Sequence, residues 1–131
     1  MSVYFFAFIG AVLGGLTVAL GAFGAHALKP YLEAWDNSYG LIIWDKAVFY
    51  QAMHSLALLS LPLFSDIMTP KAVNITGYMF IAGTLMFSGS LYVLALSGIK
   101  ILGAITPIGG TAFVIGWAVL AASLYKAAFR A

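Results

Sequence analysis

The sequence predicts an all-α integral membrane protein, a bundle of four transmembrane helices with a loop lying on the membrane surface between helices one and two. Of its 131 residues, 63% are hydrophobic and 8% are charged, which is more apolar surface than a soluble domain of this size can bury. Four apolar stretches reach the roughly 20 residues that cross a hydrocarbon core. Because no repeat or linker divides the chain, residues 1–131 are expected to form a single membrane domain.

The first span is predicted at about residues 4–28 and ends at the helix-breaking pair Lys29-Pro30. No Lys or Arg precedes it, and its apolar run is longer than that of a signal peptide. We therefore expect a retained membrane helix.

The loop of residues 29–43 is expected to lie along the membrane surface as an anchor. Amphipathic aromatic rings favour the headgroup layer. The loop and the residue after it combine such rings with acidic and amide side chains: Tyr31, Glu33, Trp35, Asp36, Asn37, Tyr39 and Trp44.

The remaining spans are predicted at about residues 44–64, 73–96 and 101–125. The short turn at residues 97–100 makes the last two antiparallel neighbours. Within the last span, Pro107 lacks an amide hydrogen and Gly109 and Gly110 follow it, a pattern that predicts a kink. The freed carbonyl is either satisfied by neighbouring hydroxyls or lines a small ion or proton path.

Small residues at helical spacing predict where helices approach each other. In lipid, helices associate through close backbone contact rather than through hydrophobicity. The expected packing positions are Gly10, Gly14, Gly21 and Ala25 on the first span and Gly77 and Thr84 on the third. Their partner is another helix of this chain or of a second copy.

Polar side chains are predicted to converge in one half of the bundle. With four crossings, the end of the first and third spans and the start of the second and fourth share one membrane face. Depths counted at about 1.5 Å per residue put most polar groups in that half. The candidate polar pocket consists of His26, Tyr50, Gln51, His54, Ser88, Ser90 and Thr106.

His54 and His26 lead to different hypotheses, because they lie at different depths in the membrane. His54 lies deep in a span, where an ionisable side chain usually faces the interior and often marks function; the alternative is a structural hydrogen bond to Ser88, Ser90 or Tyr92. His26 lies near the interface, where it can bond loop backbone, water or headgroups.

No metal or cofactor is predicted. The depths of His26 and His54 differ by about 12 Å, whereas metal ligation brings each ring nitrogen to about 2 Å from the ion. The chain contains no cysteine and offers no third ligand at suitable spacing.

Four segments together resemble a known family. They read "LGAFGAHALK", "FYQAMHSLALL", "FSGSLYVLAL" and "LGAITPIGGTAFVIGW", and they are similar to a widespread family of small four-helix membrane proteins, catalogued as a domain of unknown function, with YgdD-like bacterial members and animal relatives. The resemblance implies a bundle in a bacterial inner membrane or an organelle membrane and supplies no activity. Phe49 stands where the family pattern often has arginine, which disfavours a role for a fixed cation there.

An enzyme is the third choice of function, because no carboxylate lies deep in a span and no serine accompanies a base and an acid. Two other functions stay open. The first is a non-enzymatic membrane component that self-associates or joins a larger membrane complex. The second is a small transporter or a protein that binds an ion, a lipid or another small ligand in a polar pocket around His54. The six Lys and Arg are spread along the chain, so nucleic acid is not an expected partner.

The sequence indicates only weakly which way the bundle is oriented across the membrane. Three cations flank each membrane face: Lys71, Lys126 and Arg130 on the side of the termini, and Lys29, Lys46 and Lys100 on the other. The paired charges at the C-terminus favour both termini in the cytoplasm.

Overall fold

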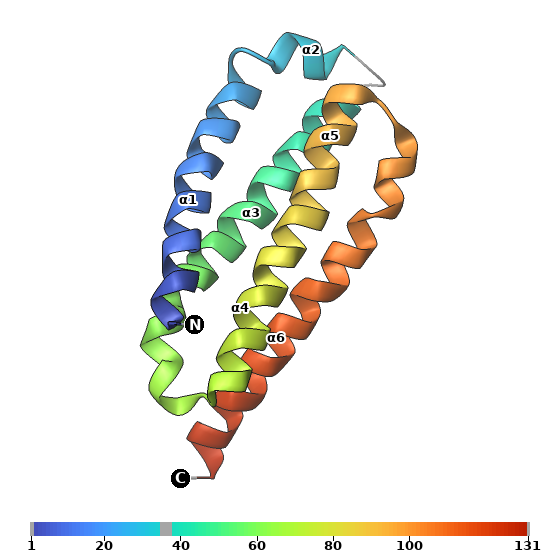
Figure 1. The fold of residues 1–131 in the computed structure, drawn as a ribbon. Coiled ribbons are helices and arrows are strands. Elements are labelled where there is room, and N and C mark those ends of the chain that lie inside the picture. Colours follow the sequence, from blue (N-terminus) through green and yellow to red (C-terminus); the bar gives the residue numbers. More distant parts are fainter. Residues whose placement is uncertain (1, 35–37, 131) are drawn as a thin grey trace.

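The computed structural model describes residues 2–34 and 38–130, and every regular element in these ranges is a helix. Within these ranges, four helical segments are long and apolar enough to cross a membrane, as predicted. Figure 1 shows both termini at one end of the bundle and the short helix α2 at the other. The elements are α1 (Val3–Ala25), α2 (Lys29–Glu33), α3 (Tyr39–Phe64), η1 (Ser65–Ile67), α4 (Pro70–Gly83), η2 (Thr84–Ser88), α5 (Gly89–Ser97), η3 (Lys100–Ala104) and α6 (Thr106–Phe129).

Several element bounds differ from the sequence prediction. The first span stops at Ala25 rather than at about 28, and α3 starts at Tyr39 rather than at about 44. The third span continues through η2, a π-helical turn between α4 and α5. The fourth begins as the 3-10 turn η3 before α6 starts at Thr106.

Part of the segment between α1 and α3 is helical, since α2 covers Lys29–Glu33. Pro30 lies in the first turn of α2, where a missing amide hydrogen costs nothing. The Tyr31 hydroxyl donates to the Leu96 carbonyl and ties α2 to the end of α5. Trp44 is buried within the bundle rather than exposed as a surface ring, and its indole donates to the Leu20 carbonyl at 2.9 Å. Three residues of the predicted anchor, Trp35, Asp36 and Asn37, lie outside the described ranges.

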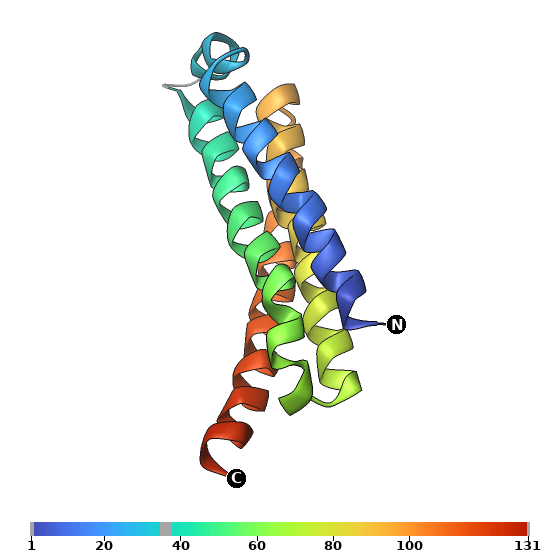
Figure 2. The same ribbon diagram turned by 90° about the vertical axis from the view of Figure 1, so that its left-hand side faces the viewer.

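The four spans form two closely packed pairs. α1 packs chiefly on α3, and α6 packs chiefly on α4 and η2, while α3 joins the pairs through its contacts with α5 and η2. Figure 2 shows α1 and α3 side by side, and α6 continuing past the other helices at the C-terminus. Large apolar side chains such as Phe8, Leu63 and Val114 cover the outside, where lipid tails would surround them.

Close contact between helices depends on glycine at two predicted positions. A Cβ on Gly10 would lie 2.7 Å from the Leu59 nitrogen and 2.7 Å from the Ser55 oxygen, so only glycine lets α1 approach the α3 backbone. Gly77 leaves room for the fully buried ring of Phe6.

The other predicted packing positions contribute less. Gly14 and Gly21 have only ordinary contacts, to Ser55 and Val48. Ala25 is exposed, and the adjacent Gly24 is the residue that packs against the Trp44 ring. Thr84 is buried, and its hydroxyl donates to the Phe80 carbonyl at 2.8 Å.

Candidate functional site: an aromatic groove between α3 and α6

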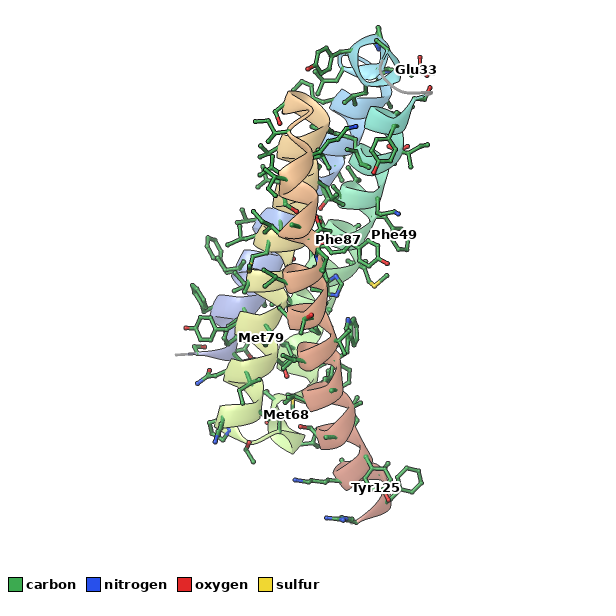
Figure 3. The ribbon with its side chains drawn as sticks, turned by 90° about the vertical axis from the view of Figure 1, so that its right-hand side faces the viewer. Glu33, Phe49, Met68, Met79, Phe87 and Tyr125 are labelled. Atoms are coloured by element: carbon green, nitrogen blue, oxygen red, sulfur yellow. The ribbon has the colours of Figure 1, made fainter. Side chains whose placement is uncertain are left out.

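A groove of about 550 Å³ lies between α3 and α6. Figure 3 shows this side of the molecule, with Phe87, which lines the groove, and Phe49, which lies on the outer side of α3. The lining includes no charged side chain and consists of Tyr50, Met53 and His54 from α3, Phe87 from η2, and Pro107, Gly110, Thr111, Phe113, Val114 and Trp117 from α6. Tyr50 and His54 stand near the middle of the span Tyr39–Ile67, so the groove opens toward the hydrocarbon core.

The π-helical turn and one glycine set the width of the groove. A Cβ on Gly109 would overlap the backbone nitrogen of Phe87, so glycine brings the start of α6 against η2. The next residue, Gly110, has only the distal ring atoms of Phe87 nearby, at 3.8 and 3.9 Å. Gly110 therefore leaves open space in the groove. π-Helical turns often occur at functional sites because they redirect side chains.

His54 is fixed by hydrogen bonds at both ring nitrogens. Its Nε2 lies 2.9 Å from the indole nitrogen of Trp117, and its Nδ1 lies 2.7 Å from the Tyr50 carbonyl oxygen. An indole N–H can only donate, so Nε2 is the acceptor. The proton is thereby assigned to Nδ1, which donates to the carbonyl, and the imidazole is neutral.

Aromatic rings enclose His54 almost completely. The side chain is 1% exposed. Its ring stacks on Phe113 with centroids 3.5 Å apart and contacts Phe80 edge-on at 5.2 Å. Such contacts fix the orientation of the imidazole beyond what burial alone would do.

Tyr50 supplies an available polar group in the groove. Its ring lies 4.4 Å from Phe87 and 6.2 Å from Phe113, centroid to centroid. Among residues 2–34 and 38–130, no hydrogen bond to its hydroxyl is formed. The other hydroxyl of the lining, that of Thr111, donates to the Pro107 carbonyl at 2.9 Å.

The remaining polar residues form separate links between helices rather than the single predicted pocket. Gln51 Nε2 donates to the Leu13 carbonyl at 3.1 Å, and Gln51 Oε1 accepts from the Tyr92 hydroxyl at 2.7 Å. The Ser88 hydroxyl donates to the Ala47 carbonyl at 2.7 Å. The hydroxyls of Ser90 and Thr106 lie 2.7 Å apart and share a hydrogen bond.

His26 does not join this site. It follows α1 as an exposed residue beside a shallow hollow formed with Ala19, Ala22, Phe23 and Ala27. Among the described residues, no three His, Asp or Glu side chains lie close enough together to hold a metal ion.

The interruption predicted at Pro107 falls at the start of α6 rather than inside it. Pro107 lies in the first turn of α6, directly after the 3-10 turn η3, and helices tolerate proline in their first turn. Gly109 provides a close contact instead of loosening the helix, and Gly110 lines the groove.

Trp117 is the hydrogen-bond partner of His54 in place of the predicted Ser88, Ser90 or Tyr92. Gly110, Phe113 and Trp117 are spaced by three and four residues, so they share one face of a helix. That spacing was the available signal for an aromatic face opposite His54.

The comparisons with known proteins agree with this architecture. Residues 20–110 match the family described as "Protein of unknown function (DUF423)". The UPF0382 membrane protein SAB0533 of Staphylococcus aureus is 44% identical over 121 residues, which cover 92% of this chain and 95% of that protein. The UPF0382 membrane protein YwdK of Bacillus subtilis is 39% identical over 122 residues, covering 92% and 96%.

No solved structure matches the chain. The family match spans most of the chain, and the relatives align over nearly their whole length and are named membrane proteins. The chain therefore belongs to the DUF423 family of membrane proteins, whose biochemical function is unknown.

Proposed function

We propose that the protein is a non-enzymatic membrane protein that binds an uncharged, lipid-soluble small molecule in the groove between α3 and α6. The observation that carries the proposal is the lining of this groove, where aromatic rings surround the Tyr50 hydroxyl, which has no hydrogen-bond partner in the described part of the chain. Binding pockets commonly combine an apolar wall with a few polar groups that orient the ligand.

The position and chemistry of the groove restrict the ligand. The groove lies near the middle of the span Tyr39–Ile67, and its lining holds no charge that could compensate a charged ligand. Moving an ion into such a place without a partner is costly. An uncharged molecule dissolved in the bilayer can instead enter from the lipid side.

A groove-filling variant tests this proposal. In Gly110→Leu the new Cβ meets only ring atoms of Phe87, at 3.8 and 3.9 Å, and the added side chain takes up space in the groove that Gly110 lines. Gly89→Leu is the matched control, because a Cβ on Gly89 meets nothing within 4 Å. Native mass spectrometry from lipid nanodiscs should show a small molecule on the wild type and on Gly89→Leu and none on Gly110→Leu. Equal retention by all three proteins would refute binding in the groove.

Self-association is a second candidate function, favoured by the outer face of α1. Ala11, Gly15 and Ala19 are exposed at four-residue spacing, and a Cβ on Gly15 meets no atom within 4 Å. Small residues so spaced let another helix approach closely in lipid. Its partner is a second copy or a component of a larger membrane complex.

Crosslinking in lipid tests this second function. The dimer fraction should fall in Gly15→Ile and stay unchanged in Val18→Ile, a substitution at another exposed position of α1. A strictly monomeric wild-type protein would rule self-association out.

We further infer a YgdD-like protein of the bacterial inner membrane with both termini in the cytoplasm. The bacterial relatives, which are named membrane proteins, support the assignment to a bacterial membrane. The charge pattern supports the orientation with both termini in the cytoplasm. Lys29 lies 3.9 Å from Glu33 at one end of the bundle, whereas Lys126 and Arg130 stand near each other at the other end. Alkaline phosphatase fused to the C-terminus should be inactive and green fluorescent protein fused there should fluoresce; the reverse pattern would invert the topology.

A further inference from the structure

We propose that the ligand of the groove is a lipid-soluble phenol, whose hydroxyl replaces the Trp117 indole as the hydrogen-bond donor to His54 Nε2. This inference rests on the proposed function and names the chemical class that the same site selects. It follows from three features: the acceptor at His54, the position of Trp117, and the ring and hydroxyl of Tyr50.

The first feature is an acceptor with a single partner. The ring proton of His54 is used at the Tyr50 carbonyl, so Nε2 is left as a neutral acceptor, and its one donor among residues 2–34 and 38–130 is the Trp117 indole. A buried acceptor without a donor costs free energy, and no water is present in a hydrocarbon core to replace the donor. A molecule that moves Trp117 aside must therefore bring a donor of its own.

The second feature is the unequal burial of the two partners. His54 is 1% exposed, whereas Trp117 is 40% exposed at the border of the groove. His54 is held between the Phe113 and Phe80 rings, so it cannot turn without opening the core. Trp117 can turn outward, because its ring is partly exposed. The hydrogen bond that the indole loses is offset when the ligand hydroxyl donates to Nε2 and its oxygen accepts from the indole or from the Tyr50 hydroxyl. The indole is the partner that a ligand can displace.

The third feature is Tyr50, whose ring and hydroxyl line the same groove as His54. The Tyr50 ring lies nearly parallel to those of His54 and Phe113, at interplanar angles of 9° and 13°. A flat ring can stack against such faces, and the Tyr50 hydroxyl offers it a second hydrogen bond. An aromatic alcohol with an apolar tail satisfies all three features, whereas an aliphatic chain uses only the apolar wall.

The test uses the full-length protein in lipid nanodiscs and two radiolabelled probes, para-nonylphenol and its methyl ether para-nonylanisole. The two probes share ring and tail, and only the phenol can donate a hydrogen bond. After subtraction of uptake by empty nanodiscs, the wild type should bind the phenol about fivefold more tightly than the ether, the effect of one net hydrogen bond. Trp117→Phe keeps a ring but removes the competing donor, so it should bind the phenol more tightly than the wild type does. His54→Phe should bind both probes equally.

Displacement of the indole has its own readout, which does not depend on His54→Phe folding. In protein labelled with fluorotryptophan, phenol should shift the fluorine resonance of Trp117. It should leave that of Trp44, whose indole donates to the Leu20 carbonyl, unchanged. A Trp117 resonance that stays in place while the phenol binds would overturn the inference.

The outcomes separate this inference from the proposed function. Equal binding of phenol and ether by the wild type, abolished by Gly110→Leu, would overturn the phenol assignment and leave the groove as a binding site. Absence of binding of either probe, together with no small molecule retained by the wild type in native mass spectrometry, would overturn both.

Discussion

Helix α3 contacts its neighbours in two different ways on two of its sides. On the side of α1, backbone meets backbone, because Gly10 lies against the main chain at Ser55 and Leu59. On the side of α6, aromatic side chains keep the helices apart, and the polar link is a side-chain hydrogen bond from Trp117 to His54. In lipid, glycine contacts leave no room between helices, whereas an interface built of rings leaves a groove that a bilayer-soluble molecule can occupy.

The largest expected effect is on the α1 side, from Gly10→Ala. The added methyl would meet two backbone atoms at 2.7 Å and the Leu58 Cβ at 2.9 Å, none of which can move independently of α3. We expect a loss of about 3 kcal/mol in the free energy of unfolding, the upper range for overpacking. Steric-trap unfolding in bicelles measures it.

Gly15→Ala on the same helix is the control for this comparison. Its Cβ meets nothing, so the better helix propensity of alanine should leave stability unchanged or raise it by up to about 1 kcal/mol. Equal effects of the two substitutions would show that backbone contact does not hold α1 to α3.

The next largest loss of stability is expected at Gly109, where α6 contacts the backbone of η2 beside the groove. In Gly109→Ala the methyl group would overlap the Phe87 backbone nitrogen, whereas in Gly110→Ala it meets only distal ring atoms at 3.8 Å. We expect a loss of about 2 kcal/mol for Gly109→Ala, less than at Gly10 because the first turn of α6 can shift into the groove. Gly110→Ala should be neutral or slightly stabilising in the same unfolding assay. Destabilisation by both would mean that the groove is closed.

A smaller effect should follow loss of the polar link across the groove. Trp117→Phe removes the donor to His54 Nε2 and should cost about 1 kcal/mol, since hydrogen bonds between membrane helices are individually weak. Combined with His54→Phe in a double-mutant cycle, the coupling free energy should have the same size. A coupling free energy near zero would indicate that the bond between the two rings does not form in lipid.

The sequence predicts the α1 side of this comparison better than the α6 side. Four apolar stretches of spanning length determine the bundle, and Gly10 and Gly77 stand out because glycine is locally recognisable inside a helix. The hydrogen-bond partner of His54 comes from a distant part of the sequence, so the residues around His54 do not reveal it. The spans are apolar on all sides, so no amphipathic pattern reveals which face of α6 turns toward α3. The 3-10 turn η3 before Thr106 was not predicted, because it differs from an α-helix in its hydrogen bonding and not in its hydropathy.

The smallest effect on stability is expected at Tyr50, which faces α6, and it can be compared with the effect at the adjacent Gln51, which bonds to α1. Tyr50→Phe removes a hydroxyl that has no partner among the described residues, so the free energy of unfolding should change by less than about 0.5 kcal/mol. Gln51→Leu removes the bonds to the Leu13 carbonyl and the Tyr92 hydroxyl and should cost about 1 kcal/mol. Binding of para-nonylphenol should show the opposite order, weakened in Tyr50→Phe and retained in Gln51→Leu. A Tyr50→Phe protein that loses stability and keeps its affinity would place the tyrosine hydroxyl in the packing of the bundle and remove it from the site.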